Sequence, residues 1–327
     1  MMLFIRGFQG PEQGKKPYST VFPSARTQFE CPTHFIPFIR SMFKKINRYP
    51  FRNLVIVLLI FNALISCSRK SEFTPAAVAA YLERHNQPYG SDSLQRYDLF
   101  LPQGRNLHTK MVIVIHGGGW VSGDKEYVNS FAKRFSDFGY AAVSMNYRLA
   151  SDSAHYPEML DDIDSVIACV LKNSVQWGIM KGYLAIFGYS AGGHLALLYT
   201  YSRNRNRNIR SVISLAGPAD IQDSTLRASQ ALYAEIGLMT GDTLPANWTL
   251  ANPSHFITPT APPTFLIHGT ADTVVPVSQA IKLNQKLKAS YAQVSLLLME
   301  DQTHLFTLDA TETFLQHTKT FLDTTLK

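Results

Sequence analysis

Gly188-Tyr189-Ser190-Ala191-Gly192-Gly193 lies between an apolar run at 183–187 and a second apolar segment at 195–199 with helical spacing. The pattern predicts a strand, a tight turn and a buried helix, with Ser190 at the turn. A residue between glycines in such a turn takes a strained backbone, and its hydroxyl stands clear of the sheet edge. The helix amides that follow favour negative charge nearby. Ser190 is therefore a candidate nucleophile, and the alternative is a Gly- and Ser-rich loop without chemistry.

The composition is that of a chain with one sizeable core. Of its 327 residues, 46% are hydrophobic and 17% are charged, and an α/β domain of this size need not split. The net charge of +7 is unevenly distributed. Residues 1–66 hold nine of the 31 Lys and Arg residues but two of the 24 Asp and Glu residues, so residues 67–327 are electrically balanced. The basic character belongs to the leader, and we therefore do not expect nucleic acid as a partner.

The N-terminal region has the layout of an export signal. A basic segment begins at Met42, an apolar run of about twelve residues follows, and Ser66 precedes Cys67. The run is shorter than the ~20 residues that span a bilayer. The sequence before Cys67 resembles the lipobox of bacterial lipoproteins. That resemblance implies cleavage before Cys67, acylation of its thiol and a lipid-anchored protein on the periplasmic or outer-surface side.

These features predict four segments. We expect residues 1–41 to be an unstructured leader upstream of the true start, residues 42–66 a lipoprotein signal peptide, residues 67–92 a polar tether with a helix, and residues 93–327 the catalytic domain. The helix is predicted over 74–84, because Thr74 can cap it, Pro75 suits its first turn and alanines follow. The three cysteines do not make a disulfide framework, and Cys169 fits the buried side of a helix.

A glycine loop follows a strand upstream of the candidate nucleophile. Residues 111–115 are apolar throughout, as in a strand covered on both faces, and they lead into His116-Gly117-Gly118-Gly119-Trp120. Such glycines let backbone amides face a ligand. A phosphate cradle is the rival interpretation, but the Lys-Ser/Thr ending is missing. We therefore expect an oxyanion hole from the amides of Gly118, Gly119 and Ala191.

The neighbours of these amides are expected to shape the site. His116 and Gly117 should order the glycine loop. Trp120 should line the substrate cavity. Tyr189 should either order the loop or line the cavity.

Further strands are predicted at 94–102, 140–145, 211–218, 263–269 and 294–299, and the first of these is expected to be antiparallel. Residues 219–262 interrupt the strand and helix rhythm, which indicates an insertion over the site. Arg148, Asp161 and Asp162 are expected to be structural, with the acids in the first turn of a helix. The sequence thus predicts an α/β fold with a mostly parallel sheet of about eight strands and helices on both faces.

Two polar residues complete a catalytic set. Asp272 follows the penultimate strand and His304 follows the last one, so both should reach the sheet edge that carries Ser190. In this set His304 would take the proton of Ser190, and Asp272 would orient His304. Asp220 is the competing acid, but it follows an earlier strand.

Residues 93–325 resemble the bacterial carboxylesterases of the α/β-hydrolase family, in the branch similar to feruloyl and acetyl esterases. The matching segments are 116–120, 146–148, 188–194 and 268–272, together with His304. Hormone-sensitive-lipase-like relatives share the glycine loop but usually have Asp where Tyr189 stands. The resemblance implies hydrolysis of small-molecule or oligosaccharide esters without a metal or organic cofactor. An amide hydrolase of the arylformamidase or peptidase type and an inactive binding module are the alternatives, and the oligomeric state stays open.

Overall fold

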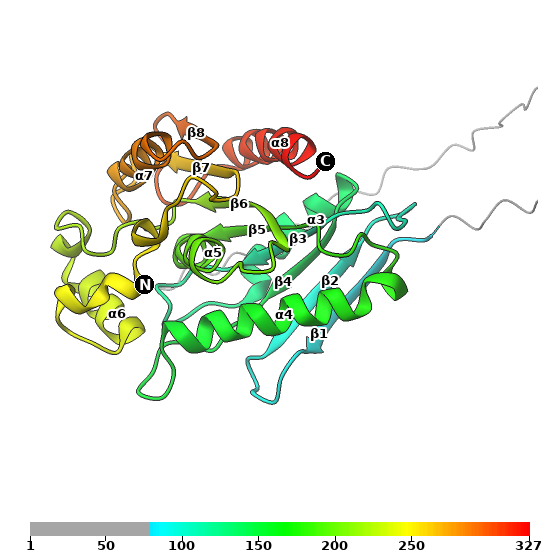
Figure 1. Cartoon of the computed structure of the whole chain (residues 1–327), viewed down its shortest axis with the longest axis horizontal. Coiled ribbons are helices and arrows are strands. Elements are labelled where there is room, and N and C mark those ends of the chain that lie inside the picture. Colours follow the sequence, from blue (N-terminus) through cyan, green and yellow to red (C-terminus); the bar gives the residue numbers. More distant parts are fainter. Residues whose placement is uncertain (1–78) are drawn as a thin grey trace, which may run out of the picture. The chain divides into compact units, whose positions relative to one another are not determined.

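The computed structural model describes residues 79–327, and within them eight strands form one sheet (Figure 1). The strands are β1 (Leu82–Pro88), β2 (Arg96–Leu101), β3 (Met111–Ile115), β4 (Ala141–Met145), β5 (Leu184–Tyr189), β6 (Ile209–Leu215), β7 (Thr264–Gly269) and β8 (Val294–Met299). The predicted leader at 1–41, the signal at 42–66 and Cys67 lie outside the described residues.

The sheet is mostly parallel, as predicted. Its strand order is β1-β2-β4-β3-β5-β6-β7-β8. The strands from β4 to β8 in this order run parallel, whereas β2 pairs antiparallel with β4, and β1 antiparallel with β2. Because parallel strands end at the same edge, the loops after β3, β5, β7 and β8 all open on one rim of the sheet.

Helices cover both faces of the sheet. They are α3 (Asn129–Asp137), α4 (Tyr156–Trp177), α5 (Ala191–Ser202), α6 (Gln230–Thr240), α7 (Ser278–Ala289) and α8 (Leu308–Thr325). Side chains of α4, α5 and α7 share one apolar core with the sheet, and those of α3 and α8 share the core on the other face. In Figure 1 the sheet accordingly lies between α4 and α8. The strands β3 to β6 are thus buried on both sides, which explains their continuous apolar runs.

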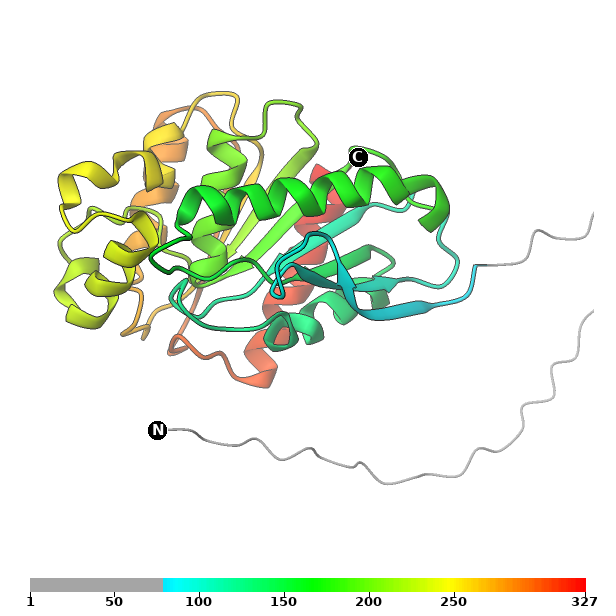
Figure 2. The ribbon, with the colours of Figure 1, turned by 90° about the horizontal axis from the view of Figure 1, so that it is seen from below.

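The segment at 219–262 is an insertion without strands, as the loss of rhythm predicted. It contains α6 and three short 3-10 helices, η4 (Leu226–Ala228), η5 (Pro245–Ala251) and η6 (Pro253–Phe256). The insertion, coloured yellow-green to yellow, lies at one end of the sheet in both ribbon views (Figures 1 and 2). Its buried Trp248 and Ile236 join the core that contains α5. A 3-10 helix, η3 (Lys125–Val128), also precedes α3.

The prediction of a helix over 74–84 is wrong for the residues of this segment that the structure describes. Leu82–Pro88 is the edge strand β1, which pairs with β2 through a register shift between Arg84 and Gln87. Asn86 N donates to Asp98 Oδ1 (2.7 Å), and His85 Nδ1 lies 3.1 Å from Asp98 Oδ2. These tertiary contacts outweigh the weak local preference for helix. The sheet therefore begins eleven residues before the predicted domain boundary at 93.

Arg148 and Asp162 form an internal ion pair, which agrees with the structural role expected for them. The guanidinium donates to the Asp162 carboxylate at 2.9 to 3.1 Å, and Arg148 N donates to Asp162 Oδ2 (2.7 Å). Asp162 is fully buried in the second turn of α4, which begins at Tyr156, so Asp161 and Asp162 lie one turn later than predicted. The pair links the end of β4 to α4 and has a structural role.

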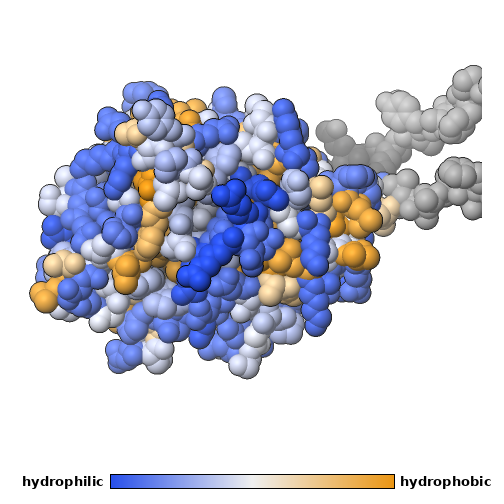
Figure 3. Space-filling model, in the orientation of Figure 1, coloured by the Kyte–Doolittle hydropathy of each residue, from blue (hydrophilic) through white to orange (hydrophobic). Residues whose placement is uncertain are grey.

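The surface and the helices show ordinary patterning. On the face in Figure 3, hydrophobic residues form separate patches between hydrophilic ones. Within residues 79–327, no helix combines the length and the hydrophobicity that a membrane crossing requires.

Candidate active site

Ser190 occupies the turn between β5 and α5 with a left-handed backbone, φ 55° and ψ −120°. The turn requires small neighbours. A Cβ on Gly188 would run into the backbone of Gly192, and a Cβ on Gly192 would run into the carbonyl oxygens at the end of β3. The glycines therefore let α5 start directly against the sheet, and the Ser190 hydroxyl stands at the rim.

The rim brings Ser190, His304 and Asp272 together. His304 follows β8, and its Nε2 lies 2.9 Å from Ser190 Oγ. Its Nδ1 lies 2.8 Å from Asp272 Oδ2, in the loop after β7. Because a carboxylate can only accept, Nδ1 carries the proton and Nε2 accepts from the serine hydroxyl. In this tautomer the imidazole can take the Ser190 proton.

Asp272 is held as a carboxylate. Its Oδ1 accepts from the amides of Val274 and Val275, both at 2.9 Å. Its Oδ2 lies 3.3 Å from His268 Nε2. Burial raises the pKa of Asp272, but the hydrogen bonds from His268 and His304 outweigh it, and the pKa ends well below its ordinary value. The carboxylate is thus ionised across the neutral range.

Asp220, the competing acid, lies in another network. Its Oδ1 accepts from Asn252 Nδ2 (2.7 Å) and Gln222 N (3.1 Å). Within the described chain, its hydrogen bonds go to the insertion and to Gln279 rather than to His304.

The glycine loop after β3 borders Ser190. Gly118 and Gly119 have positive φ, 114° and 60°. A Cβ on Gly117 would lie 3.0 Å from Ser190 Cβ, so the loop packs directly on the nucleophile turn. Among residues 79–327, no acceptor is recorded for the amides of Gly118, Gly119 and Ala191. Within the described chain, no protein acceptor thus competes with a ligand for these three donors.

Two aromatic side chains order the loops around the site. His116 is buried and stacks on Tyr147 with ring centres 4.4 Å apart. Its Nδ1 lies 2.7 Å from Gly117 O, and burial lowers its pKa. The Tyr189 hydroxyl donates to His304 O (2.8 Å), which ties the histidine loop to the nucleophile turn.

His194, in the first turns of α5, joins three parts of the site. Trp120 Nε1 donates to its Nδ1 (3.2 Å), and its Nε2 donates to Ala251 O (2.8 Å). Burial lowers the pKa of His194 to about 4, so the ring is neutral. The sequence contained this residue in a motif, but its bridging role appears only in the fold.

A cavity of about 300 Å³ opens over these groups. It is lined by Gly117–Trp120, Tyr127, Tyr189–Ala191, Pro218, Leu232, Glu235, Val274, Val275 and His304. Most of this lining is apolar, and the insertion supplies Leu232 and Glu235 from α6. Sequence reasoning missed Glu235, because no motif marks it and the shape of the insertion could not be derived.

A family model described as BD-FAE matches residues 97–287, more than half of the chain. The chain belongs to the BD-FAE family. The match contains the glycine loop, Ser190 and Asp272, and it ends before His304.

Named relatives of this BD-FAE chain include esterases. Esterase LipC of Mycobacterium tuberculosis is 28% identical over 249 residues, which are 70% of this chain and 61% of LipC. The chain thus spans less than two thirds of that relative's length.

Solved structures share the fold of this BD-FAE chain. A truncated carbohydrate esterase from gut microbiota has a TM-score of 0.65 at 20% identity, covering 76% of this chain and 99% of that one. Esterase B from Lactobacillus rhamnosis has a TM-score of 0.63 at 22% identity, covering 89% and 96%. The fold is therefore the α/β-hydrolase fold that the resemblance implied.

Metal ligands do not cluster in the part of the chain that the structure describes. Among residues 79–327, no group of three or more His, Cys, Asp or Glu side chains is arranged to hold a metal ion.

Proposed function

We propose that this protein is a serine carboxylic-ester hydrolase that works through an acyl-enzyme on short acyl or aromatic esters, including esters of carbohydrates. The observation that carries the proposal is the pair of contacts at His304, 2.9 Å to Ser190 Oγ and 2.8 Å to Asp272. The unpaired amides beside Ser190 support it, as do the relatives named as esterases.

Acylation begins when Ser190 Oγ attacks the ester carbonyl carbon and its proton passes to His304 Nε2. The carbonyl oxygen gains negative charge and accepts hydrogen bonds from the amides of Gly118, Gly119 and Ala191. One such donor contributes about 3 kcal/mol to lowering the barrier. The bond to the alcohol oxygen then breaks, and His304 returns the proton to that oxygen.

Deacylation repeats the steps with water. His304 takes a proton from the water as its oxygen attacks the acyl carbon, and it returns the proton to Ser190 Oγ when the acid leaves. Asp272 stays ionised throughout and stabilises the imidazolium that forms twice in each turnover.

The size of the cavity supports small acyl groups. About 300 Å³ is at the lower end of the range for small-molecule sites, and it accommodates an acetyl, butyryl or feruloyl group more readily than a long chain.

A panel of acetyl, butyryl, octanoyl and feruloyl esters tests the proposal, with Ser190→Ala as the control. We expect hydrolysis of the short or aromatic esters and its loss in the variant. An aryl formamide is assayed in parallel, and turnover of the formamide in preference to p-nitrophenyl acetate would favour an amide hydrolase. A binding protein would hydrolyse none of them.

We also propose that the protein is an exported lipoprotein whose acylated Cys67 anchors it to a membrane. Support comes from the basic segment, the apolar run and the lipobox-like sequence before Cys67. Intact-mass analysis of the natural protein tests this, and a mature N-terminus upstream of Cys67 contradicts it.

A further inference from the structure

One carboxylate faces the catalytic cavity. Glu235 and Leu232 are three positions apart on α6, so they share one face of that helix, and both line the cavity that contains Ser190. The side chain of Glu235 reaches the glycine loop. A Cβ on Gly119 would collide with the Glu235 carboxylate, which places this group directly over the loop that carries the candidate oxyanion amides.

Nothing in the described protein neutralises this carboxylate. Within residues 79–327, the Glu235 carboxylate forms no ion pair and no hydrogen bond, and burial alone raises its pKa. Among the residues that line the cavity, Glu235 is the one acid, and the lining contains no Lys or Arg. A half-buried carboxylate without a partner costs free energy, so its position calls for a role toward a ligand.

The chemistry of a carboxylate defines that role. It accepts hydrogen bonds from neutral donors such as hydroxyl and amide groups. It also repels negative charge, and in a partly desolvated cavity this repulsion exceeds its value in bulk water. An ester with an anionic group near the reacting carbonyl would therefore meet repulsion from Glu235 during binding, whereas a neutral ester would not.

We propose that Glu235 sets the charge selectivity of this site: it selects neutral esters that carry a hydrogen-bond donor near the scissile bond and rejects anionic ones. The inference rests on the proposed esterase function. Glu235 has no part in the proton transfers, which belong to Ser190, His304 and Asp272.

The test compares matched neutral and anionic esters on each side of the scissile bond. On the alcohol side, 4-acetoxybenzamide is the neutral donor and 4-acetoxybenzoate its anionic counterpart. On the acyl side, p-nitrophenyl butyrate is compared with p-nitrophenyl hemisuccinate. The ratio of kcat/KM, neutral over anionic, is measured for the wild type and for Glu235→Gln. Comparing the two proteins cancels the intrinsic reactivity of each ester.

We expect the ratio in the wild type to exceed that in Glu235→Gln by about tenfold in at least one pair, the effect of a nearby charge in a partly screened site. Glu126→Gln is the matched control. Glu126 is exposed and does not line the cavity, so this variant should keep the wild-type ratios. Ratios that differ less than threefold between wild type and Glu235→Gln in both pairs overturn the inference.

A second measurement needs no variant. Raising the ionic strength from about 0.02 M to about 0.5 M shortens the Debye length, so wild-type kcat/KM for the disfavoured anionic ester should rise relative to its neutral partner. A ratio that does not respond to salt contradicts the charge mechanism. The two proposals can fail separately. Ester hydrolysis that persists in Ser190→Ala contradicts the proposed esterase function. Hydrolysis that depends on Ser190, with the same neutral-to-anionic ratio of kcat/KM in wild type and Glu235→Gln, contradicts only the role of Glu235.

Discussion

Two cavities of similar size differ in how their polar groups are arranged. The cavity at Ser190 measures about 300 Å³, and a second, of about 350 Å³, is lined by side chains from the segments 200–210 and 256–263. The second cavity lies beside the loops that enter β6 and β7, whereas Ser190, Asp272 and His304 follow the carboxyl ends of their strands. The two hollows are thus at opposite edges of the sheet.

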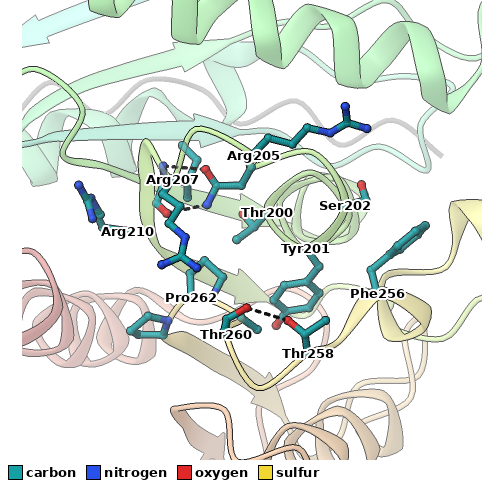
Figure 4. Close-up of a pocket in the computed structure, with 14 residues that line it drawn as sticks. Thr200, Tyr201, Ser202, Arg205, Arg207, Arg210, Phe256, Thr258, Thr260 and Pro262 are labelled. Carbon is teal, nitrogen blue, oxygen red and sulfur yellow. Dashed lines mark hydrogen bonds between the residues drawn. The ribbon is translucent and has the colours of Figure 1, made fainter.

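The second cavity has basic side chains that do not converge. In Figure 4 the side chains of Arg205, Arg207 and Arg210 extend in different directions. Arg210 lies over the Tyr183 ring, 4.6 Å from its centre. Other polar groups are paired with one another, as in the hydrogen bond between Thr258 and Thr260 (3.2 Å). At Ser190, by contrast, a hydroxyl, an imidazole and a carboxylate form one chain. Convergence of groups, rather than volume, distinguishes a candidate site.

Breaking the chain of groups at Ser190 should have the largest effect. Asp272→Asn should lower kcat/KM for p-nitrophenyl acetate by about 10⁴-fold, because the amide no longer fixes the His304 tautomer. Steady-state kinetics measures this. Asp220→Asn serves as the control and should lose far less. Comparable losses of kcat/KM in the two variants would contradict the assignment of Asp272 as the acid that orients His304.

Displacing the glycine loop should have the next largest effect. In Gly118→Ala the new Cβ would meet the backbone of Ser122 at a φ of 114°, so the loop amides would move. We expect kcat to fall about 10² to 10³-fold, as for the loss of an oxyanion donor. Gly139→Ala is the matched control, since its φ is also positive and its Cβ would meet open space. An equal loss of kcat in Gly118→Ala and Gly139→Ala would indicate general backbone strain and would contradict a specific role of the loop amides.

The negative charge of Glu235 in the Ser190 cavity should also affect the free energy of unfolding. Burial raises the pKa of Glu235 in the folded state above its unfolded value, so ionisation is harder in the folded protein. The wild type therefore loses stability as the pH rises from about 4 to about 7, and Glu235→Gln does not share this loss. Relative to wild type, the variant should become more stable across this range, by less than about 1 kcal/mol because the side chain is half exposed. Urea unfolding at several pH values measures it, and a gain that shrinks with rising pH contradicts the assignment.

Removing a charge from the second cavity should have the smallest effect. Arg207→Gln should leave kcat/KM for p-nitrophenyl acetate within about twofold of wild type, because its charge is at the opposite edge of the sheet and is screened by solvent. The same ester assay measures it. A tenfold loss of kcat/KM would instead show that the second cavity is coupled to the site at Ser190.

The parts of the molecule that sequence could predict share a strong local signal. The β3 and β8 strands have the bounds that their apolar runs predicted. Ser190, Asp272 and His304 were found because each follows a strand, and parallel topology brings such positions to one rim. The polar edge strand β1 lacks this signal, since its identity depends on contacts with Asp98. Glu235 depends on how the whole insertion folds, and no local pattern encodes that.

The buried imidazole of His194 has a consequence for exchanging parts between family members. It receives a hydrogen bond from Trp120, 74 positions earlier, and gives one to Ala251, 57 positions later. An insertion grafted from a relative would have to present a carbonyl at the position of Ala251 O. Without it, the imidazole would lose its acceptor, and the indole that borders the glycine loop would lose its alignment while the triad stayed intact. Successful chimeras should therefore replace 120, 194 and 219–262 as a single unit.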